Sequence, residues 1–268
     1  MEKEALVDPG WVAEHLDDPD VRVVEVDVSP ANYEEGHIPG AILWDAYKDL
    51  RRPDYTPADE DEIDELLARS GVSPDTTIVF YGYGPHLGHW LLDRHGHERI
   101  LVMKGGREAW EGDGREWSTE APEPSPAPYE RKDGNPELIV TKEELETLLG
   151  DGSAVVLDVR SPEEFSGERF WPSGATEDVG RAGHLPGAVH VPVDVVRDPD
   201  DGDPEEVRRV FTSAGVIPER RVVAYCTIGN RASEVSFYLR HVLDYPNVAI
   251  YYGSWSEWGH LPDTPVET

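Results

Sequence analysis

The sequence predicts an α/β fold built from two tandem copies of one unit, each with a largely parallel sheet. Short apolar runs, typical of buried strands, alternate along the chain with amphipathic segments that are typical of helices. Four sequence blocks recur in the same order in the two halves of the chain, and a proline-rich stretch separates the halves. These patterns indicate a duplicated strand–helix unit rather than one large domain.

The internal repeat rests on four matched blocks. They are, in order, a valine-rich strand with an aspartate at its end, a Gly-His-x-Pro-Gly-Ala turn, a second apolar strand, and a segment that contains glycine and tryptophan. The matched ranges are 23–28 with 154–160, 33–41 with 183–188, 78–82 with 222–226, and 104–110 with 252–258. Because the order is kept, we expect the same fold twice.

The two copies are joined by the segment 118–128, in which prolines alternate with other residues. Proline fixes φ and donates no backbone hydrogen bond, so we expect an extended segment that belongs to neither a helix nor a sheet. The sequence therefore predicts a first domain over 1–118, a linker over 119–137 and a second domain over 138–268.

Local signals predict the elements of the second copy. Thr141 and Glu144 form a capping box at the start of a helix that runs to Leu149. The remaining pattern predicts strands over 154–158, 221–225 and 248–251, helices over 204–214 and 232–239, and a short final helix with two tryptophans. In parallel sheets of this kind, ligands bind beyond the carboxyl ends of the strands.

The chain is strongly acidic, with 55 acidic and 24 basic residues among 268 and a formal net charge of −31. Without a basic patch it cannot neutralise phosphates, so nucleic acid is not an expected partner. Molar salt would screen this self-repulsion within ~3 Å. The composition therefore favours adaptation to a high-salt cytoplasm, as in halophilic archaea, and a moderately acidic mesophilic protein is the alternative.

The sequence also predicts a cytoplasmic protein that needs no cofactor, metal or membrane. No stretch approaches the ~20 apolar residues of a membrane span, and the acidic N-terminus lacks a signal-peptide apolar region. A single cysteine excludes an intrachain disulfide, which agrees with a reducing compartment. The histidines between residues 86 and 97 match no standard metal-ligand spacing.

Cys226 is the candidate nucleophile. It follows the apolar run 222–225, opens the loop 226–231 and precedes an expected helix. Helix N-termini and nearby cations favour the thiolate form of cysteine, and backbone N–H groups of such a loop can hold an anion. Gly82 stands at the matching position of the first copy, which is therefore expected to lack a nucleophile. An inert buried cysteine is the alternative.

Taken together, these motifs resemble the two-domain rhodanese-like sulfurtransferases, over both copies outside the linker. The most similar subgroup is the thiosulfate sulfurtransferases, whose loop has the pattern C-[RT]-x-G-x-R. The resemblance implies a five-stranded parallel sheet flanked by helices in each domain. It also implies an inactive first domain, an active second domain and a site in the cleft between them.

The resemblance implies transfer of sulfane sulfur from thiosulfate to cyanide or another thiophilic acceptor through a persulfide on Cys226. The partners would then be a small-molecule donor and acceptor. The residues expected to bind the substrate form the cysteine loop: Thr227, Ile228, Gly229, Asn230 and Arg231. The loop glycine would allow a tight curl, and the loop arginine would either bind the substrate oxyanion or pair with an acidic residue.

Other residues are expected to support the site. The resemblance implies that Asp158 and Arg160 order the active-site loops, with a structural ion pair as the alternative. His37 and His184 occur in the turns of both copies, so they are expected to serve the fold.

This sequence departs from the family at two cations. Some relatives place a substrate-binding arginine where this chain has Glu164, and many carry arginine or lysine at the position of Thr227. Arg169 or Arg181, within an insert that the first copy lacks, could supply the missing charge. Trp255 could line the cleft.

Three other functions stay open. 3-Mercaptopyruvate could be the donor, although its users typically carry a C-G-S-G loop. A sulfur carrier would pass persulfide sulfur to a partner protein, for example in a thiolation pathway. A phosphatase or arsenate reductase is the remote alternative, because in those relatives five residues separate the cysteine from the arginine, whereas four separate Cys226 from Arg231.

Overall fold

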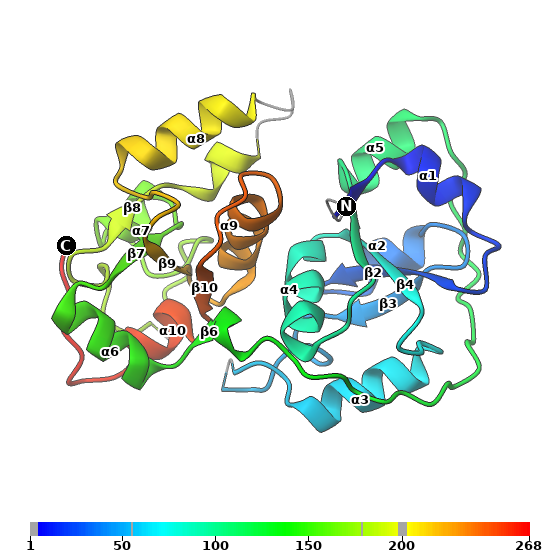
Figure 1. Ribbon diagram of the computed structural model, residues 1–268, viewed down its shortest axis with the longest axis horizontal. Helices are drawn as coiled ribbons and strands as arrows, with labels where there is room; N and C mark the ends of the chain where they lie inside the picture. Colours follow the sequence, from blue (N-terminus) through cyan, green and yellow to red (C-terminus); the bar gives the residue numbers. More distant parts are fainter. Residues whose placement is uncertain (1–4, 55, 178, 198–202) are drawn as a thin grey trace. The chain divides into compact units, whose positions relative to one another are not determined.

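The computed structural model in Figure 1 describes residues 5–54, 56–177, 179–197 and 203–268. The chain forms two compact units. The first contains the described residues up to Pro53 together with Pro57–Pro136, and the second contains Glu137–Thr268. Within the described ranges, no helix combines the length and the apolar character that crossing a bilayer requires.

The first unit is a five-stranded parallel sheet with the strand order β1-β5-β4-β2-β3. Its strands are β1 (Leu6–Val7), β2 (Val21–Asp27), β3 (Ile42–Asp45), β4 (Thr77–Gly82) and β5 (Ile100–Met103). Its helices are α1 (Pro9–Glu14), α2 (Ala31–Glu35), α3 (Glu60–Arg69), α4 (Pro85–His95) and α5 (Gly106–Gly112). Core residues of α1 and α5 pack with β2 and β4 on one face of the sheet.

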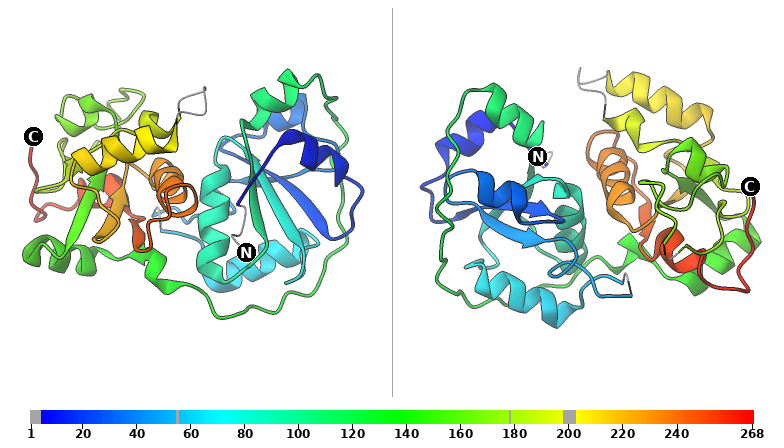
Figure 2. Two further views of the ribbon diagram at one scale, coloured as in Figure 1. Left: turned by 45° about the horizontal axis from the view of Figure 1, so that its top comes forward. Right: turned by 180° about the vertical axis from the view of Figure 1, so that it is seen from behind.

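The second unit repeats this topology, with the strand order β6-β10-β9-β7-β8 and all pairs parallel. Its strands are β6 (Ile139–Val140), β7 (Ala154–Asp158), β8 (Val189–His190), β9 (Arg221–Tyr225) and β10 (Val248–Tyr251). Its helices are α6 (Lys142–Asp151), α7 (Pro162–Phe165), α8 (Pro204–Ser213), α9 (Asn230–His241) and α10 (Ser254–Trp258). Both faces of each sheet carry helices (Figure 2). The predicted α/β fold with two five-stranded parallel sheets is thus confirmed.

Burial explains why the central strands are so apolar. The residues 222–225 of β9 have no exposed surface, because helices cover both faces of the sheet. The expected bounds of β7, β9 and β10 agree with the structure, and the expected capping box holds the start of α6. Helix α9 begins at Asn230, two residues before its expected start. Its first turn is therefore part of the cysteine loop.

The linker has no helix or strand at residues 119–135, as its prolines predict. It is nevertheless held against the first unit. The Ala127 N–H donates to the Ala68 carbonyl at 2.9 Å, and the Tyr129 hydroxyl lies 3.0 Å from Nδ1 of His97. This segment is therefore ordered and packs along the first unit, and it is not a flexible linker.

Gly82, at the end of β4, takes a backbone conformation that disfavours a side chain. Its φ is +100°, and a Cβ built there would lie 2.8 Å from the Val26 carbonyl oxygen and 2.9 Å from Cγ of Glu25. Both neighbours belong to β2, the adjacent strand. The first unit therefore excludes a cysteine at this position on steric grounds, in addition to lacking one.

We predict that Gly82→Cys destabilises the protein by about 1–3 kcal/mol, because the new side chain combines a positive φ with overpacking. Urea unfolding measures this change in the free energy of unfolding. Gly112→Ala is the matched control, since a Cβ at Gly112 meets nothing within 4 Å. A Gly82→Cys protein as stable as the control would contradict this account of the first unit.

Candidate active site

Cys226 lies directly after β9, at the carboxyl end of a central strand, and its side chain is buried. The Gly229 N–H donates a hydrogen bond to Sγ at 3.1 Å. Gly229 has a φ of +92°, and a Cβ built on it would lie 3.2 Å from the Tyr252 ring. Glycine is thus needed here both for the left-handed turn and for the close contact with the tyrosine.

The thiol sits at the N-terminus of α9, because Gly229 is the N-cap of that helix and carries no capping side chain. The first N–H groups of a helix have no partner within the helix, and the helix dipole places partial positive charge at that end. The loop turns the Gly229 N–H toward the thiol. Such a site can hold an anionic group attached to sulfur.

The start of α10 fixes the other side of the loop. The N–H groups of Trp255 and Ser256 donate to the carbonyls of Cys226 and Thr227 at 3.0 and 2.9 Å. The Cys226 N–H in turn donates to Oγ of Ser254 at 3.2 Å. These contacts orient the peptide groups on both sides of Cys226.

Ser254 makes these contacts from a left-handed conformation, with a φ of +53°. The corresponding residue of the first unit is Gly106, with a φ of +51°, so the backbone shape belongs to the fold. Only the second unit holds a side chain there. The strain is offset by a hydroxyl that accepts from Cys226 and donates to the Tyr251 carbonyl at 2.9 Å.

The guanidinium of Arg231 binds Glu164 from α7 rather than pointing to an open surface. Its Nη1 donates to Oε2 of Glu164 at 2.8 Å, and its Nη2 donates to Oε1 at 2.9 Å. Thr227 joins them, because its hydroxyl donates to Glu164 at 2.7 Å and accepts from Arg231 at 2.6 Å. We call these three residues the Glu164 cluster. Of the two roles expected for Arg231, this geometry shows pairing with an acidic residue.

The charges of the Glu164 cluster depend on one another. Burial would raise the pKa of Glu164, but the hydrogen bonds and charge of Arg231, with the Thr227 hydroxyl, hold this pKa at about 2. Burial would lower the pKa of Arg231, but Glu164 and an electrostatic interaction with Cys226 raise it above its ordinary value. Both groups are therefore ionised at neutral pH, and the arginine lies within electrostatic reach of the nucleophile.

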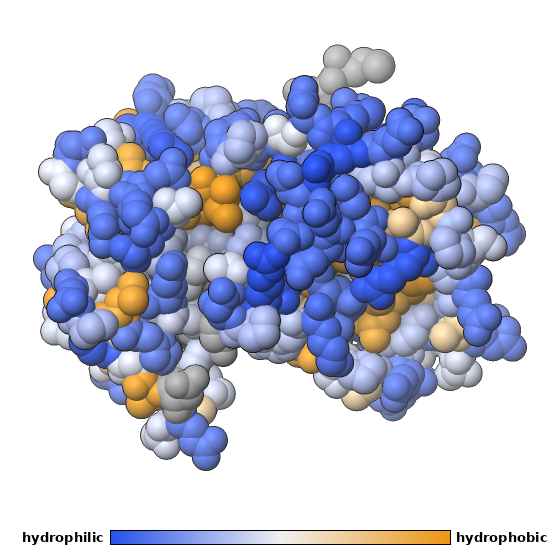
Figure 3. All heavy atoms as spheres, turned by 90° about the horizontal axis from the view of Figure 1, so that it is seen from below, coloured by the Kyte–Doolittle hydropathy of each residue, from blue (hydrophilic) through white to orange (hydrophobic). Residues whose placement is uncertain are grey.

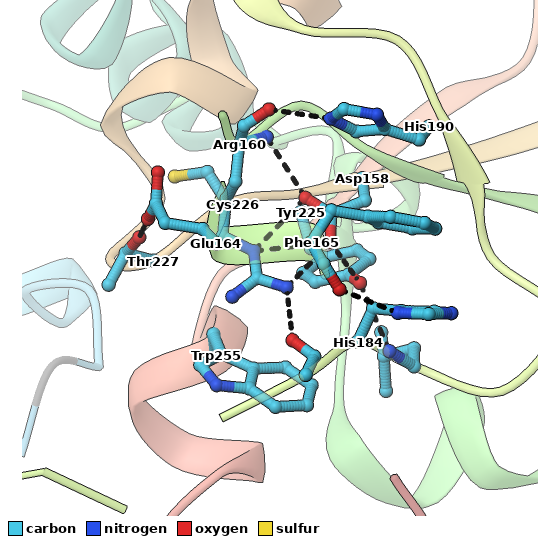
Figure 4. Close-up of polar contacts among 12 residues, drawn as sticks. Asp158, Arg160, Glu164, Phe165, His184, His190, Tyr225, Cys226, Thr227 and Trp255 are labelled. Atoms are coloured by element: carbon cyan, nitrogen blue, oxygen red, sulfur yellow. Dashed lines mark hydrogen bonds and ion pairs between the residues drawn. The ribbon is translucent and has the colours of Figure 1, made fainter. Parts of the chain in front are cut away.

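A second buried network, drawn in Figure 4, joins the end of β7 to the loop. Asp158 accepts from Nη2 of Arg160 at 2.7 Å and from the Tyr225 hydroxyl at 2.5 Å. Arg160 also donates to the Gly183 carbonyl at 2.6 Å, and its guanidinium lies 4.6 Å from the centroid of the Trp255 ring. Asp158, Arg160 and Trp255 have no exposed surface. This network reaches Tyr225, the residue before Cys226, from within the core.

The first unit contains a matching arrangement. The Tyr81 hydroxyl accepts from the Ile38 N–H at 3.0 Å, as the Tyr225 hydroxyl accepts from Leu185 at 3.1 Å. Glu25 takes the place of the carboxylate and pairs with Arg107 at 2.7 Å. Because the first unit has no cysteine, this tyrosine–carboxylate arrangement belongs to the fold that both units share.

The turn histidines have matching surroundings in both units. The rings of His37 and His184 stack on Tyr33 and Phe165, with centroids 3.8 and 3.7 Å apart. Nδ1 of each lies 2.8 Å from the carbonyl of its aromatic partner. This equivalence supports the structural role expected for them.

The arginines of the insert are engaged elsewhere. Arg169 pairs with Glu163 at 2.8 Å. Arg181 donates to the carbonyl oxygens of Thr264 and Trp258, at 2.5 and 3.4 Å, and so holds the C-terminal segment. In this structure, neither guanidinium replaces the cation that some relatives have at the position of Glu164.

The sequence alone did not indicate the roles of Tyr225 and Ser254. It also did not indicate that Glu164 is the acid that binds both Arg231 and Thr227. The tyrosine and the left-handed residue lie within blocks that repeat in both copies, so the repeat itself contained a signal for them. The Glu164–Arg231 pair had no such signal, because its members are 67 positions apart.

Comparisons with known proteins agree with the repeat. The sequence matches the rhodanese-like domain family over residues 8–113 and again over 141–261. The sulfur carrier protein TtuD of Thermus thermophilus is 37% identical, covering 98% of this chain and 96% of that protein. The thiosulfate sulfurtransferase of Corynebacterium glutamicum is 34% identical, covering 99% of this chain and 91% of that protein.

The fold is similar to that of the anaerobic ergothioneine biosynthesis enzyme from Chlorobium limicola. The TM-score is 0.89 at 25% identity, and the match covers 100% of this chain and 71% of that chain.

We predict that Glu164 contributes to stability only while it is ionised. Its folded-state pKa of about 2 lies below the ordinary 4.5, so its contribution is complete above pH 4.5 and is lost as the pH falls toward 2. The shift corresponds to at most about 3 kcal/mol. Urea unfolding of the wild type and of Glu164→Gln between pH 6 and 3 should show the wild-type advantage shrinking as the pH falls. An advantage that stays constant over this range would refute the assignment.

Proposed function

The chain belongs to the rhodanese-like domain family, and on that premise we propose that it is a thiosulfate sulfurtransferase that carries sulfur on Cys226. The observation that carries the proposal is the thiol at the N-terminus of α9, with the Gly229 N–H 3.1 Å from Sγ. This geometry suits a nucleophile that must hold a negatively charged sulfur after the first step.

In the first step, the Cys226 thiolate attacks the sulfane sulfur of thiosulfate. A new S–S bond forms at Sγ, the S–S bond of thiosulfate breaks, and its electron pair leaves with sulfite. The enzyme then carries a persulfide whose outer sulfur is anionic. Backbone N–H groups of residues 227–231 are suited to stabilise this charge without any side-chain cation.

In the second step, a thiophilic acceptor such as cyanide attacks the outer sulfur. The S–S bond of the persulfide breaks, its electron pair returns to the Cys226 thiolate, and thiocyanate leaves. No cofactor or outside oxidant is needed, because the donor brings the sulfur at the required oxidation level. The two steps form a covalent double displacement.

A sulfur carrier is the second candidate function. The similarity to a protein named as a sulfur carrier favours it, since that protein aligns over nearly the whole chain. A carrier would form the same persulfide but would pass the sulfur to a protein partner. Rapid multiple turnover of thiosulfate and cyanide would distinguish the enzyme from a carrier that discharges slowly onto small acceptors.

We also propose that the acidic excess adapts the protein to high salt. Hydrophilic residues cover most of the face shown in Figure 3, and the formal net charge is −31. At low ionic strength, like charges on such a surface repel one another and oppose the compact state. Salt near 1 M reduces the Debye length to ~3 Å and removes most of this repulsion.

We predict that Cys226→Ser abolishes thiocyanate formation from thiosulfate and cyanide, because a serine hydroxyl cannot form the persulfide. The rate of thiocyanate production by the purified variant measures this, and circular dichroism shows whether the fold is kept. Turnover by the serine variant near the wild-type rate would refute the assignment of the nucleophile.

We predict that the thermal unfolding midpoint rises as KCl is increased from 0.1 to 1 M. The reason is that added salt progressively screens the repulsion between the acidic residues, and screening is nearly complete near 1 M. Sucrose at matched osmolality is the control, because it adds no ions. If the midpoint stays constant or falls across this range of KCl, the surface charge is not an adaptation to salt.

A further inference from the structure

The only cation of the cysteine loop is already occupied by an internal carboxylate. Glu164 is fully buried, the Arg231 side chain is 16% exposed, and two parallel hydrogen bonds of 2.8 and 2.9 Å join them. A carboxylate held in this way has the geometry in which arginine binds the oxyanion of a substrate. Glu164 therefore occupies the hydrogen-bonding position at the Arg231 guanidinium that the sulfonate group of a donor would otherwise occupy.

The pairing limits the positive charge that the loop can offer. The charges of Glu164 and Arg231 cancel within the cluster, and Thr227 is neutral. What remains is the N-terminus of α9, which is equivalent to roughly half of one positive charge. This partial charge suits a singly charged donor, whereas thiosulfate brings two negative charges.

We propose that Glu164 is a specificity-determining residue that withholds Arg231 from the donor, so that the Cys226 site favours singly charged sulfane donors over dianionic ones. This inference rests on the proposed function, because it concerns the donor for sulfur transfer to Cys226.

Arg231 is placed so that it could interact with a donor at Cys226 if Glu164 lost its charge. It lies in the first turn of α9, the helix whose N-terminus faces Sγ, and its pKa is raised by Glu164 and also by an electrostatic interaction with Cys226. One guanidinium is thus within electrostatic reach of both anions. Without the negative charge of Glu164, its attraction would act on the thiolate and on the donor bound there.

Two donors allow this charge effect to be isolated. Methanethiosulfonate carries one negative charge and thiosulfate carries two, and both deliver a sulfane sulfur to a thiolate. In each case the Cys226 S–S bond forms, the donor S–S bond breaks, and the electron pair leaves with methanesulfinate or with sulfite. Comparing the ratio of kcat/KM values between variants cancels the different intrinsic reactivities of the donors.

The test is Glu164→Gln, assayed with both donors and cyanide in one buffer. Glutamine keeps the side-chain length and one oxygen that can accept in the capping box with Ser161. It removes the charge and replaces one oxygen that accepts from Arg231 with an N–H donor. We expect the kcat/KM ratio of thiosulfate to methanethiosulfonate to rise about tenfold, which corresponds to one pKa unit of interaction with a nearby charge. The rise should come from a lower KM for thiosulfate.

Glu234→Gln is the matched control, because Glu234 lies on α9, as Arg231 does, and binds Arg197 through paired hydrogen bonds. It removes the same formal charge and should leave the donor ratio unchanged. The double variant Glu164→Gln with Arg231→Gln should lose the gain, since the effect requires the freed arginine. An unchanged ratio in Glu164→Gln, or an equal rise in the control, would overturn the proposal.

If Glu164→Gln does not fold, the double variant still tests the proposal. It is expected to fold, because removing both members of a buried pair leaves no unpaired charge. Its donor ratio should match that of the wild type, because neither donor gains or loses a charged partner. A selective loss of thiosulfate would show that Arg231 binds the donor in the wild type and would refute the proposal. A wild type that uses neither donor would instead refute the proposed function itself.

Discussion

The structure of the site depends on one reversal of the backbone, from the end of β9 to the start of α9 within residues 226–229. Only a left-handed residue at Gly229, packed on the Tyr252 ring, allows the helix to begin so soon after the strand. The reversal places a helix N-terminus directly at Sγ. The buried networks around Asp158 and Glu164 then hold the two sides of this turn.

A comparison of the two units distinguishes the features that the fold requires from those that occur only beside Cys226. Both units keep a tyrosine that joins a buried carboxylate to the Gly-His-x-Pro-Gly-Ala turn. Both also keep a left-handed residue at the first position of the last helix. Only the second unit adds a cysteine, the Ser254 hydroxyl that accepts from it, and the Glu164 cluster. These additions are the features that we propose to serve sulfur transfer.

Local patterns made much of the fold predictable. The bounds of β7, β9 and β10 follow from continuous buried runs, and the start of α6 follows from its capping box. Cys226 was identified because a loop and a helix follow its strand in the sequence. The partner of Arg231 could not be found in this way, because pairing with Glu164 depends on how β7 and β9 lie side by side. Arg181 and Trp255 likewise turned out to pack inside the second unit, through contacts distant in sequence.

The central claim is that Cys226 takes up sulfane sulfur, and mass spectrometry of the intact protein tests it most directly. After incubation with thiosulfate and removal of the excess, the protein should gain the mass of one sulfur atom, located on the peptide that contains Cys226. Cyanide should then remove this mass and release thiocyanate. A protein whose mass is unchanged by thiosulfate, or whose added sulfur lies on another peptide, would contradict the account.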